Sequence, residues 1–133
     1  MSLFSQRALD IPVPWINYIG QGTIEELLDD IDSLRLSNVL YPAKGQELSI
    51  FHKILPSDVK VVILSQNPYA DANANGVAFS CQHWVSTSIR QLYFAITEDP
   101  SMLTCNEDDF PHDMTLTTWI NQGVLLTNVT YIS

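Results

Sequence analysis

Basic residues are scarce in this sequence: six Lys and Arg stand against fifteen Asp and Glu, which gives a formal net charge of −9 at pH 7. Proteins that bind nucleic acid nonspecifically neutralise phosphates with Lys and Arg, and their affinity follows the number of those contacts. Six basic side chains cannot form an extended positive surface, which argues against strong nonspecific DNA binding by this chain alone. Local phosphate contacts from backbone N–H groups and helix N-termini remain open to it.

Cysteines and long apolar runs are scarce too. Cys81 and Cys105 are far apart and form no C-x-x-C pair, so we interpret them as free thiols of a reducing compartment. No apolar run approaches the roughly 18 residues that a membrane helix needs, and the start of the chain, MSLFSQRALDIP, lacks the apolar core of a signal peptide. An intracellular protein of the cytoplasm or nucleus, with no membrane association, is expected. A viral or phage gene is one source left open.

The apolar content suits one domain. Hydrophobic residues make up 46% of the 133 positions, enough for a single compact domain over residues 1–133 and too little for two. Residues 1–40 are expected to form a helical arm, whose first part (1–22) has no clear period. Thr23-x-x-Glu26 matches a capping box and predicts a helix start. The apolar residues that follow recur at helical spacing, and the intervening acidic ones predict a solvated face: Ile24, Leu27, Leu28, Ile31 and Leu34 against Glu25, Glu26, Asp29, Asp30 and Asp32.

Two apolar segments predict strands. Residues 59–64, VKVVIL, are β-branched and nearly continuous, as in a strand buried on both faces of a parallel sheet, and 124–126, VLL, predict a second buried strand. Helices are predicted at about 45–55, from a cap at Ser86, Thr87 or Ser88 to about Thr97, and at 116–121 before Gly123. Two parallel strands with helices between them predict a right-handed β–α–β unit.

Polar clusters follow both predicted strands. Ser65-Gln66-Asn67 comes directly after the first, and Thr127-Asn128 directly after the second. Ligands of parallel sheets bind beyond the carboxyl ends of the strands, so these clusters predict a site there. The pattern by itself does not identify a substrate.

Segment 59–80, VKVVILSQNPYADANANGVAFS, resembles the signature of the uracil-DNA glycosylase family, in which a strand precedes G-Q-D-P-Y-H and later G-L-A-F-S. Segment 116–128, LTTWINQGVLLTN, is similar to the family's L-S-x-W-A-x-Q-G-V-L-L-L-N, and Tyr41-Pro42 and 88–93, SIRQLY, also fit. The resemblance covers about residues 41–133. It implies an α/β fold with three α/β/α layers and a parallel sheet, of which this chain would be a truncated, N-terminal half.

The same resemblance implies roles for particular residues. A glycosylase flips uracil out of the base stack and reads it in a tight pocket. Phe79 would stack on the base, and Asn128 would pair with uracil N3–H and O4 and so reject cytosine. Tyr69 would close the pocket against the thymine methyl group, and Gln66 would contact the region of O2. The candidate phosphate contacts are Ser80, Ser86 and Ser88.

The sequence departs from the family pattern where catalysis is concerned. Asn67 stands at the position of the catalytic Asp, and an amide can orient water but supplies no charge, whereas a charge–charge interaction near 4 Å is worth about 4 kcal/mol at an effective dielectric of about 20. Related glycosylases that act on mismatched bases do use Asn there. Ala70 replaces the motif's His, and no histidine follows Asn128, so the family's later His-Pro-Ser-Pro loop has no counterpart here. No metal-ligand spacing is found, and no cofactor is implied.

Three functions stay open at this point. The first is a catalytically impaired DNA-binding, uracil-binding or assembly module derived from a glycosylase. The second is an active uracil-DNA glycosylase completed by further chain or by a partner. The third is an acidic decoy of a DNA-binding protein. Half of a parallel sheet would leave a strand edge and an apolar face uncovered. We therefore also expect a protein partner: a second copy, another polypeptide, or further sequence of the same protein.

Overall fold

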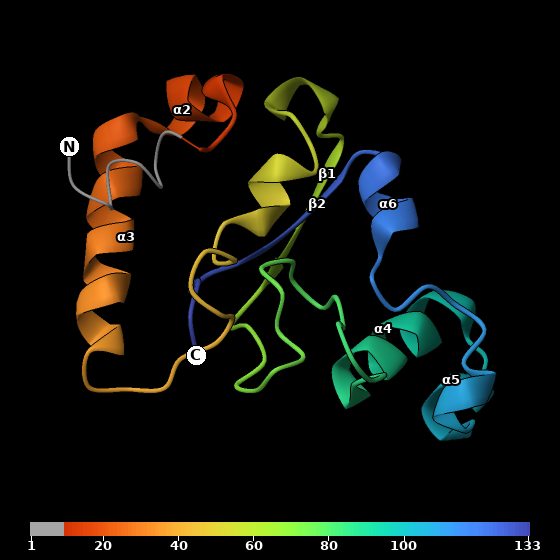
Figure 1. The fold of residues 1–133 in the computed structure, drawn as a ribbon. Coiled ribbons are helices and arrows are strands. Elements are labelled where there is room, and N and C mark those ends of the chain that lie inside the picture. Colours follow the sequence, from red (N-terminus) through yellow and green to blue (C-terminus); the bar gives the residue numbers. More distant parts are fainter. Residues whose placement is uncertain (1–9) are drawn as a thin grey trace.

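The computed structural model describes residues 10–133. Helices surround a pair of strands that runs through the middle of the molecule (Figure 1). In chain order the elements are α2 (Val13–Ile19), α3 (Gln21–Arg35), the 3-10 turns η1 (Ser49–His52) and η2 (Pro56–Asp58), β1 (Val61–Ser65), α4 (Thr87–Thr97), α5 (Ser101–Thr104), η3 (Glu107–Asp109), α6 (Thr117–Asn121) and β2 (Val124–Asn128).

The two strands are parallel, as the sequence predicts. Their register pairs Val61 with Val124 and ends on Ser65 opposite Asn128. The helix α3 lies on one side of the strand pair and α4, α5 and α6 lie on the other (Figure 1). Helices on both sides of a parallel sheet confirm the α/β class. The register also brings the two polar clusters to the same end of the sheet.

The strand β2 passes through the core. Leu125 and Leu126 are buried, and Leu126 packs in one cluster with the fully buried Ile50, Ile89 and Leu116. Burying one such side chain stabilises the fold by about 1.5–3 kcal/mol. The core therefore fixes β2 and, through the ladder, the position of β1.

The prediction that the first strand is buried on both faces is wrong. Val61, Val62 and Leu64 are 52, 56 and 61% exposed, and Ile63 is the residue of β1 that packs against the core. Within residues 10–133, β1 has β2 as its one strand neighbour, and no element covers these three side chains. An apolar strand with this much exposed surface is typical of a face that another polypeptide segment covers.

The N-terminal arm is more regular than its sequence indicates. The aperiodic region contains α2, whose Pro14 lies in the first turn, where the missing N–H costs nothing. Trp15 is buried and donates from Nε1 to the carbonyl oxygen of Ile54 at 2.6 Å, which ties α2 to the core. Residues 1–9 of the predicted arm lie outside the described residues.

The predicted helix start at the Thr23 capping box is wrong, because α3 begins two residues earlier at Gln21, after Gly20. The predicted solvated face is wrong at Asp32, which is buried and lies 3.8 Å from the ammonium of Lys44. Conversely, Leu34 is 49% exposed although its spacing places it on the apolar side. The loop after α3 folds back over the helix and decides which side is covered.

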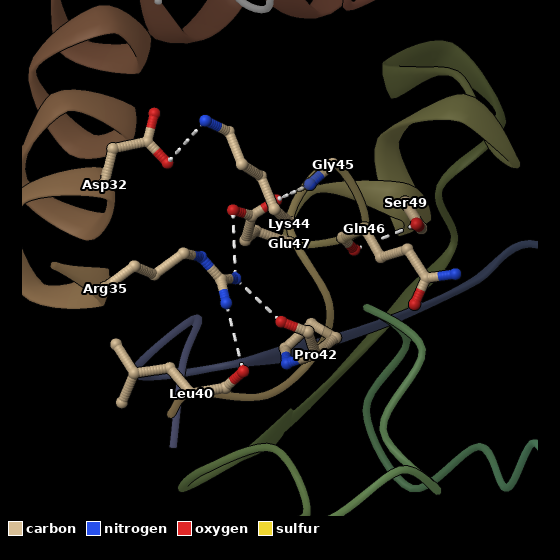
Figure 2. A network of polar contacts seen from close by, with 9 residues as sticks. All are labelled: Asp32, Arg35, Leu40, Pro42, Lys44, Gly45, Gln46, Glu47 and Ser49. Atoms are coloured by element: carbon tan, nitrogen blue, oxygen red, sulfur yellow. Dashed lines mark hydrogen bonds and ion pairs between the residues drawn. The ribbon is translucent and has the colours of Figure 1, made fainter. Parts of the chain in front are cut away.

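Arg35 holds this loop, which runs through residues 40–47 (Figure 2). Its guanidinium donates from Nη1 to the carbonyl of Leu40 at 3.0 Å and from Nη2 to the carbonyl of Pro42 at 2.7 Å. Nη2 also lies 3.2 Å from Oε2 of Glu47, a carboxylate that is 1% exposed and accepts from the backbone N–H of Gly45 at 2.7 Å. A buried carboxylate thus has a positive partner.

Replacing that partner is expected to destabilise the fold. Arg35→Leu removes the positive charge beside buried Glu47, and breaking a buried ion pair costs about 3–5 kcal/mol. Lys44→Leu is the matched control, because the Lys44 side chain is 55% exposed and its ammonium lies 3.8 Å from Asp32, so solvent screens this pair and a smaller loss is expected. Urea denaturation of both variants checks this. Equal losses would show that the guanidinium is not specifically needed.

The helix predicted at 45–55 is replaced by the turns η1 and η2. Gly45 has φ +94°, which breaks a helix at its first residue, and Pro56 starts the second turn. Leu48, Phe51 and Ile54 are buried at the spacing of a helical face, whereas Leu55 is 41% exposed and Ile96 of α4 is 58% exposed. Short 3-10 turns place every third or fourth residue inward much as a helix does. These residues are therefore buried although the predicted helix does not form.

Candidate functional site

The loop after β1, residues 66–80, is fixed by a buried asparagine. Asn73 is 1% exposed; its Oδ1 accepts from the N–H of His83 at 2.8 Å, and its Nδ2 donates to the carbonyl of Trp84 at 2.9 Å. Asp71 Oδ1 in turn accepts from the N–H of Asn73 at 2.9 Å. No pattern in the sequence indicates a role for Asn73. Its place in a polar loop gives no signal that it is buried.

The loop then packs against the η1 region at Gly76. This glycine has φ +85°, and its carbonyl accepts from the N–H of Ile50 at 3.3 Å. A Cβ at this position would lie 1.9 Å from the carbonyl oxygen of Gln46 and 2.8 Å from Cβ of Ser49. Only glycine fits here, which explains the family-like glycine of the G-V-A-F-S block in physical terms.

The residues after Gly76 run along β2. The N–H of Ala78 donates to the carbonyl of Leu126 at 3.1 Å, and the N–H of Cys81 donates to the carbonyl of Met114 at 2.8 Å. Phe79 lies between them with φ +64°. A left-handed backbone at a non-glycine residue costs about 1–3 kcal/mol and is common at binding sites. The backbone hydrogen bonds on either side hold this part of the loop in one conformation.

A cavity of about 80 Å³ lies at the carboxyl end of β1. It brings together four of the sequence-predicted site residues: Asn67, Tyr69, Phe79 and Ser88. The other four, Gln66, Ser80, Ser86 and Asn128, do not line it. The remaining lining residues are Ser65, Pro68, Ala74, Asn75, Gly76 and Val77.

Asn128 lies next to this cavity, at the end of β2. It is paired with Ser65 of the cavity wall, and the N–H of Val129 donates to the carbonyl of Ser65 at 2.8 Å. Asn128 is 7% exposed, and its Oδ1 is buried without a hydrogen-bond partner among the described residues. An unsatisfied buried acceptor costs about 1–3 kcal/mol, so a ligand that brings an N–H donor to it would recover that free energy.

Tyr69 braces the aromatic side of the cavity. Its hydroxyl donates to the carbonyl of Phe79 at 2.8 Å and shares a 2.6 Å hydrogen bond with Oγ of Ser86. Burial raises the pKa of the Tyr69 phenol well above its ordinary value, so the side chain is neutral and keeps its proton for these bonds. Tyr69 therefore fixes the backbone of Phe79 in addition to lining the cavity.

The three serines differ in access. Ser80 is 1% exposed and accepts from Nδ2 of Asn75 at 2.8 Å. Ser86 caps α4, as predicted, by accepting from the N–H of Ile89 at 3.1 Å. Ser88 is exposed in the first turn of α4 and lines the cavity. Of the three hydroxyls, that of Ser88 is the one open to a ligand.

Asn67 and Gln66 are exposed beyond β1, beside the residues that follow β2. The N–H of Thr130 donates to the carbonyl of Gln66 at 3.1 Å, and the Thr130 hydroxyl donates to Oδ1 of Asn67 at 2.8 Å. No motif or spacing in the sequence indicates a role for Thr130. Only the register of the strands places it beside Asn67.

Two further classes of site are not found in residues 10–133. No group of three or more His, Cys, Asp or Glu side chains could hold a metal ion there. Among the helices of the same residues, none is long and apolar enough to cross a membrane.

Together the fold and the site define a parallel α/β protein whose ligand cavity lies beyond the strand ends, between an aromatic ring and side-chain amides. The chain is 35% identical over 134 residues to the uracil-DNA glycosylase of Equine herpesvirus 2, covering 92% of this chain and 51% of that protein. It is 28% identical over 131 residues to the uracil-DNA glycosylase of Saimiriine herpesvirus 2, covering 93% and 50%. It is thus a relative of the uracil-DNA glycosylase family and spans about half the length of the curated relatives it matches.

The fold agrees with this relationship. A crystal structure of mimivirus uracil-DNA glycosylase superposes with a TM-score of 0.66 at 21% identity, over 96% of this chain and 47% of that one. No family model matches the chain. The shared fold accounts for the parallel strands with helices on both sides.

Proposed function

We propose that the chain is a uracil-DNA glycosylase-like module that binds an extruded uracil base in the cavity between Asn67 and Phe79 and has impaired excision activity. The observation that carries this proposal is the buried, unsatisfied Oδ1 of Asn128 beside a cavity with an aromatic wall. Uracil N3–H is a donor that matches this acceptor, and a flat base matches the Phe79 ring. The names of the relatives support the same substrate class.

The impairment follows from the charges around the cavity. No acidic side chain lines it: Asn67 stands where the family has its Asp. Asp71 in the same loop accepts from the N–H of Asn73, which turns it to a structural role. The oxocarbenium-like sugar cation of glycoside cleavage thus lacks a facing carboxylate. Binding needs only the aromatic ring and the amides, so it is expected to outlast catalysis.

A second candidate is a working enzyme in which the second half of the family fold completes the site. The exposed Val61, Val62 and Leu64 of β1 favour this, because further chain that pairs with the free edge of β1 and packs against its two faces would cover them. The chain spans about half of the curated relatives' length, which is consistent with a cover of that kind. The protein partner is accordingly proposed to dock on β1. The acidic-decoy hypothesis has the net charge of −9 as its one support.

The binding proposal is tested on Asn128. Asn128→Ala is expected to weaken binding of a uracil-containing oligonucleotide by about 5–150-fold, since a buried hydrogen bond of about 1–3 kcal/mol is lost. Fluorescence anisotropy measures the affinity, with a thymine oligonucleotide as the reference ligand. Asn121→Ala is the control variant, because Asn121 is an exposed asparagine of α6.

Two outcomes would contradict the proposal. The first is equal affinity for the uracil and thymine oligonucleotides, because the cavity would then not read the base. The second is an equal effect of the Asn128 and Asn121 substitutions, because the loss would then not come from the buried amide.

A further inference from the structure

Asn67 and Thr130 occupy equivalent places after their strands. Asn67 lies two residues beyond Ser65, the last residue of β1, and Thr130 lies two residues beyond Asn128, the last residue of β2. The ladder continues past both ends, because the N–H of Val129 donates to the carbonyl of Ser65 at 2.8 Å and the N–H of Thr130 donates to that of Gln66 at 3.1 Å. The backbone therefore holds the two side chains next to one another.

The Thr130 hydroxyl has one proton and three acceptors within reach. Oγ1 lies 2.8 Å from Oδ1 of Asn67, 3.4 Å from the carbonyl oxygen of Gln66 and 3.5 Å from that of Ile132. A hydroxyl donates a single hydrogen bond, and hydroxyl bonds are strongest near 2.7–2.8 Å. The proton therefore goes to Asn67. The amide oxygen of Asn67 then uses one of its two lone pairs on Thr130, and its Nδ2 is the donor that the side chain offers to a ligand.

We propose that Thr130 is a positioning residue that holds the Asn67 amide with its oxygen on the Thr130 hydroxyl and its NH₂ group toward the cavity. The role of this orientation in ligand recognition rests on the proposed function. An NH₂ group donates two hydrogen bonds and accepts none, so in this orientation Asn67 recognises an acceptor, such as a carbonyl oxygen of a pyrimidine. It supplies no negative charge, which a carboxylate at this position would supply.

The orientation predicts a difference from an ordinary exposed asparagine. A free amide rotates and offers its oxygen as readily as its nitrogen. The Asn67 amide is held at its oxygen by a neighbouring strand end, so it presents a donor in the unbound protein. Thr130 thereby shifts the site from positioning water to binding a ligand, without itself touching the cavity.

The test is an NMR comparison of the Asn67 side chain in the unchanged protein and in variants of Thr130. A hydrogen bond to an amide oxygen moves the adjacent ¹³Cγ resonance downfield. Thr130→Val, which has the same shape without a hydroxyl, is expected to move the Asn67 ¹³Cγ resonance upfield, and Thr130→Ser is expected to keep it near its original position. Thr104→Val, an exposed threonine of α5, is the control that leaves the resonance unchanged.

A second measurement uses the Asn67→Asp variant. A hydroxyl that donates to a carboxylate stabilises the charged form, so the pKa of Asp at this position is expected to lie below the ordinary value of about 3.9 while Thr130 is present. Adding Thr130→Val is expected to raise the titration midpoint, followed by the carboxyl ¹³C resonance, by about half a pH unit or more. Threonine and valine are both neutral, so the difference reports the hydroxyl alone.

The inference is overturned if Thr130→Val leaves the Asn67 ¹³Cγ resonance in place, if Thr104→Val moves it equally, or if the two titration midpoints coincide. An Asn67 NH₂ resonance that responds to Thr130→Val while ¹³Cγ does not would show the reverse orientation and would also overturn it. Neither measurement needs DNA. A protein that does not bind uracil would therefore contradict the proposed function, whereas the NMR spectra alone would still test the orientation of Asn67.

Discussion

Asn67→Asp is expected to raise the rate of uracil release about a thousand-fold when the chain is completed by the second half of a relative's fold. The substitution returns a negative charge to the cavity wall, where it faces the sugar cation of the transition state. A charge–charge interaction near 4 Å is worth about 4 kcal/mol at an effective dielectric of about 20, and each 1.36 kcal/mol is a factor of about ten in rate. Uracil release from a labelled oligonucleotide measures the effect.

Asn75→Asp is the matched control for this experiment. Asn75 lines the same cavity, so the variant adds the same charge a short distance from the position of the family's Asp. It is expected to give no comparable gain, because its side chain is engaged with Ser80 and the N–H of Val77. Fast uracil release by the completed chain without any substitution would contradict the impaired site and favour the working enzyme. Equal rates for the unchanged chain and for Asn67→Asp would remove the charge argument.

Gly76→Ala is expected to lower the free energy of unfolding by about 2–5 kcal/mol. A Cβ would stand 1.9 Å from the carbonyl oxygen of Gln46, a backbone atom, so the chain itself has to move. The overlap adds about 1–3 kcal/mol to the roughly 1–2 kcal/mol that a side chain costs at positive φ. Urea denaturation gives the loss. The same movement is expected to distort the cavity, because Gly76 is part of its wall.

Gly45→Ala separates these two contributions. Gly45 has φ +94°, close to the +85° of Gly76, but no atom lies within 4 Å of where its Cβ would be. Its substitution is expected to cost only the backbone part, about 1–2 kcal/mol. Equal losses for the two variants would show that the packing of the loop against Gln46 contributes nothing to stability.

The relationship to the uracil-DNA glycosylases and the features of the site lead to one physical picture. In the proposed function the aromatic wall and the buried amide of Asn128 form the base-binding surface, and neither depends on charge. The carboxylate that would turn binding into cleavage is absent at Asn67, where an amide held by Thr130 takes its place. The proposed function, a module that binds uracil with most of the excision rate lost, combines these two features.

The sequence by itself determined the features that short-range chemistry controls. The β-branched run before Ser65 and the apolar run before Asn128 form strands where predicted, Ser86 caps α4, and Gly123 follows the end of α6. Parallel strands then bring both polar clusters to one end of the sheet. The strands, the cap and the stop depend on a residue's own conformational preference or on neighbours a few positions away, which the sequence displays directly.

Only the tertiary structure decided which of these surfaces are covered. Asp32 is buried because the loop at Lys44 folds over α3, and the apolar side chains of β1 are exposed because no described element covers that face. The Asn67 amide is oriented by Thr130, 63 residues further along the chain. Burial and hydrogen bonding of this kind depend on which distant segment packs against a residue. The residue's own neighbours in the sequence do not indicate which segment that is.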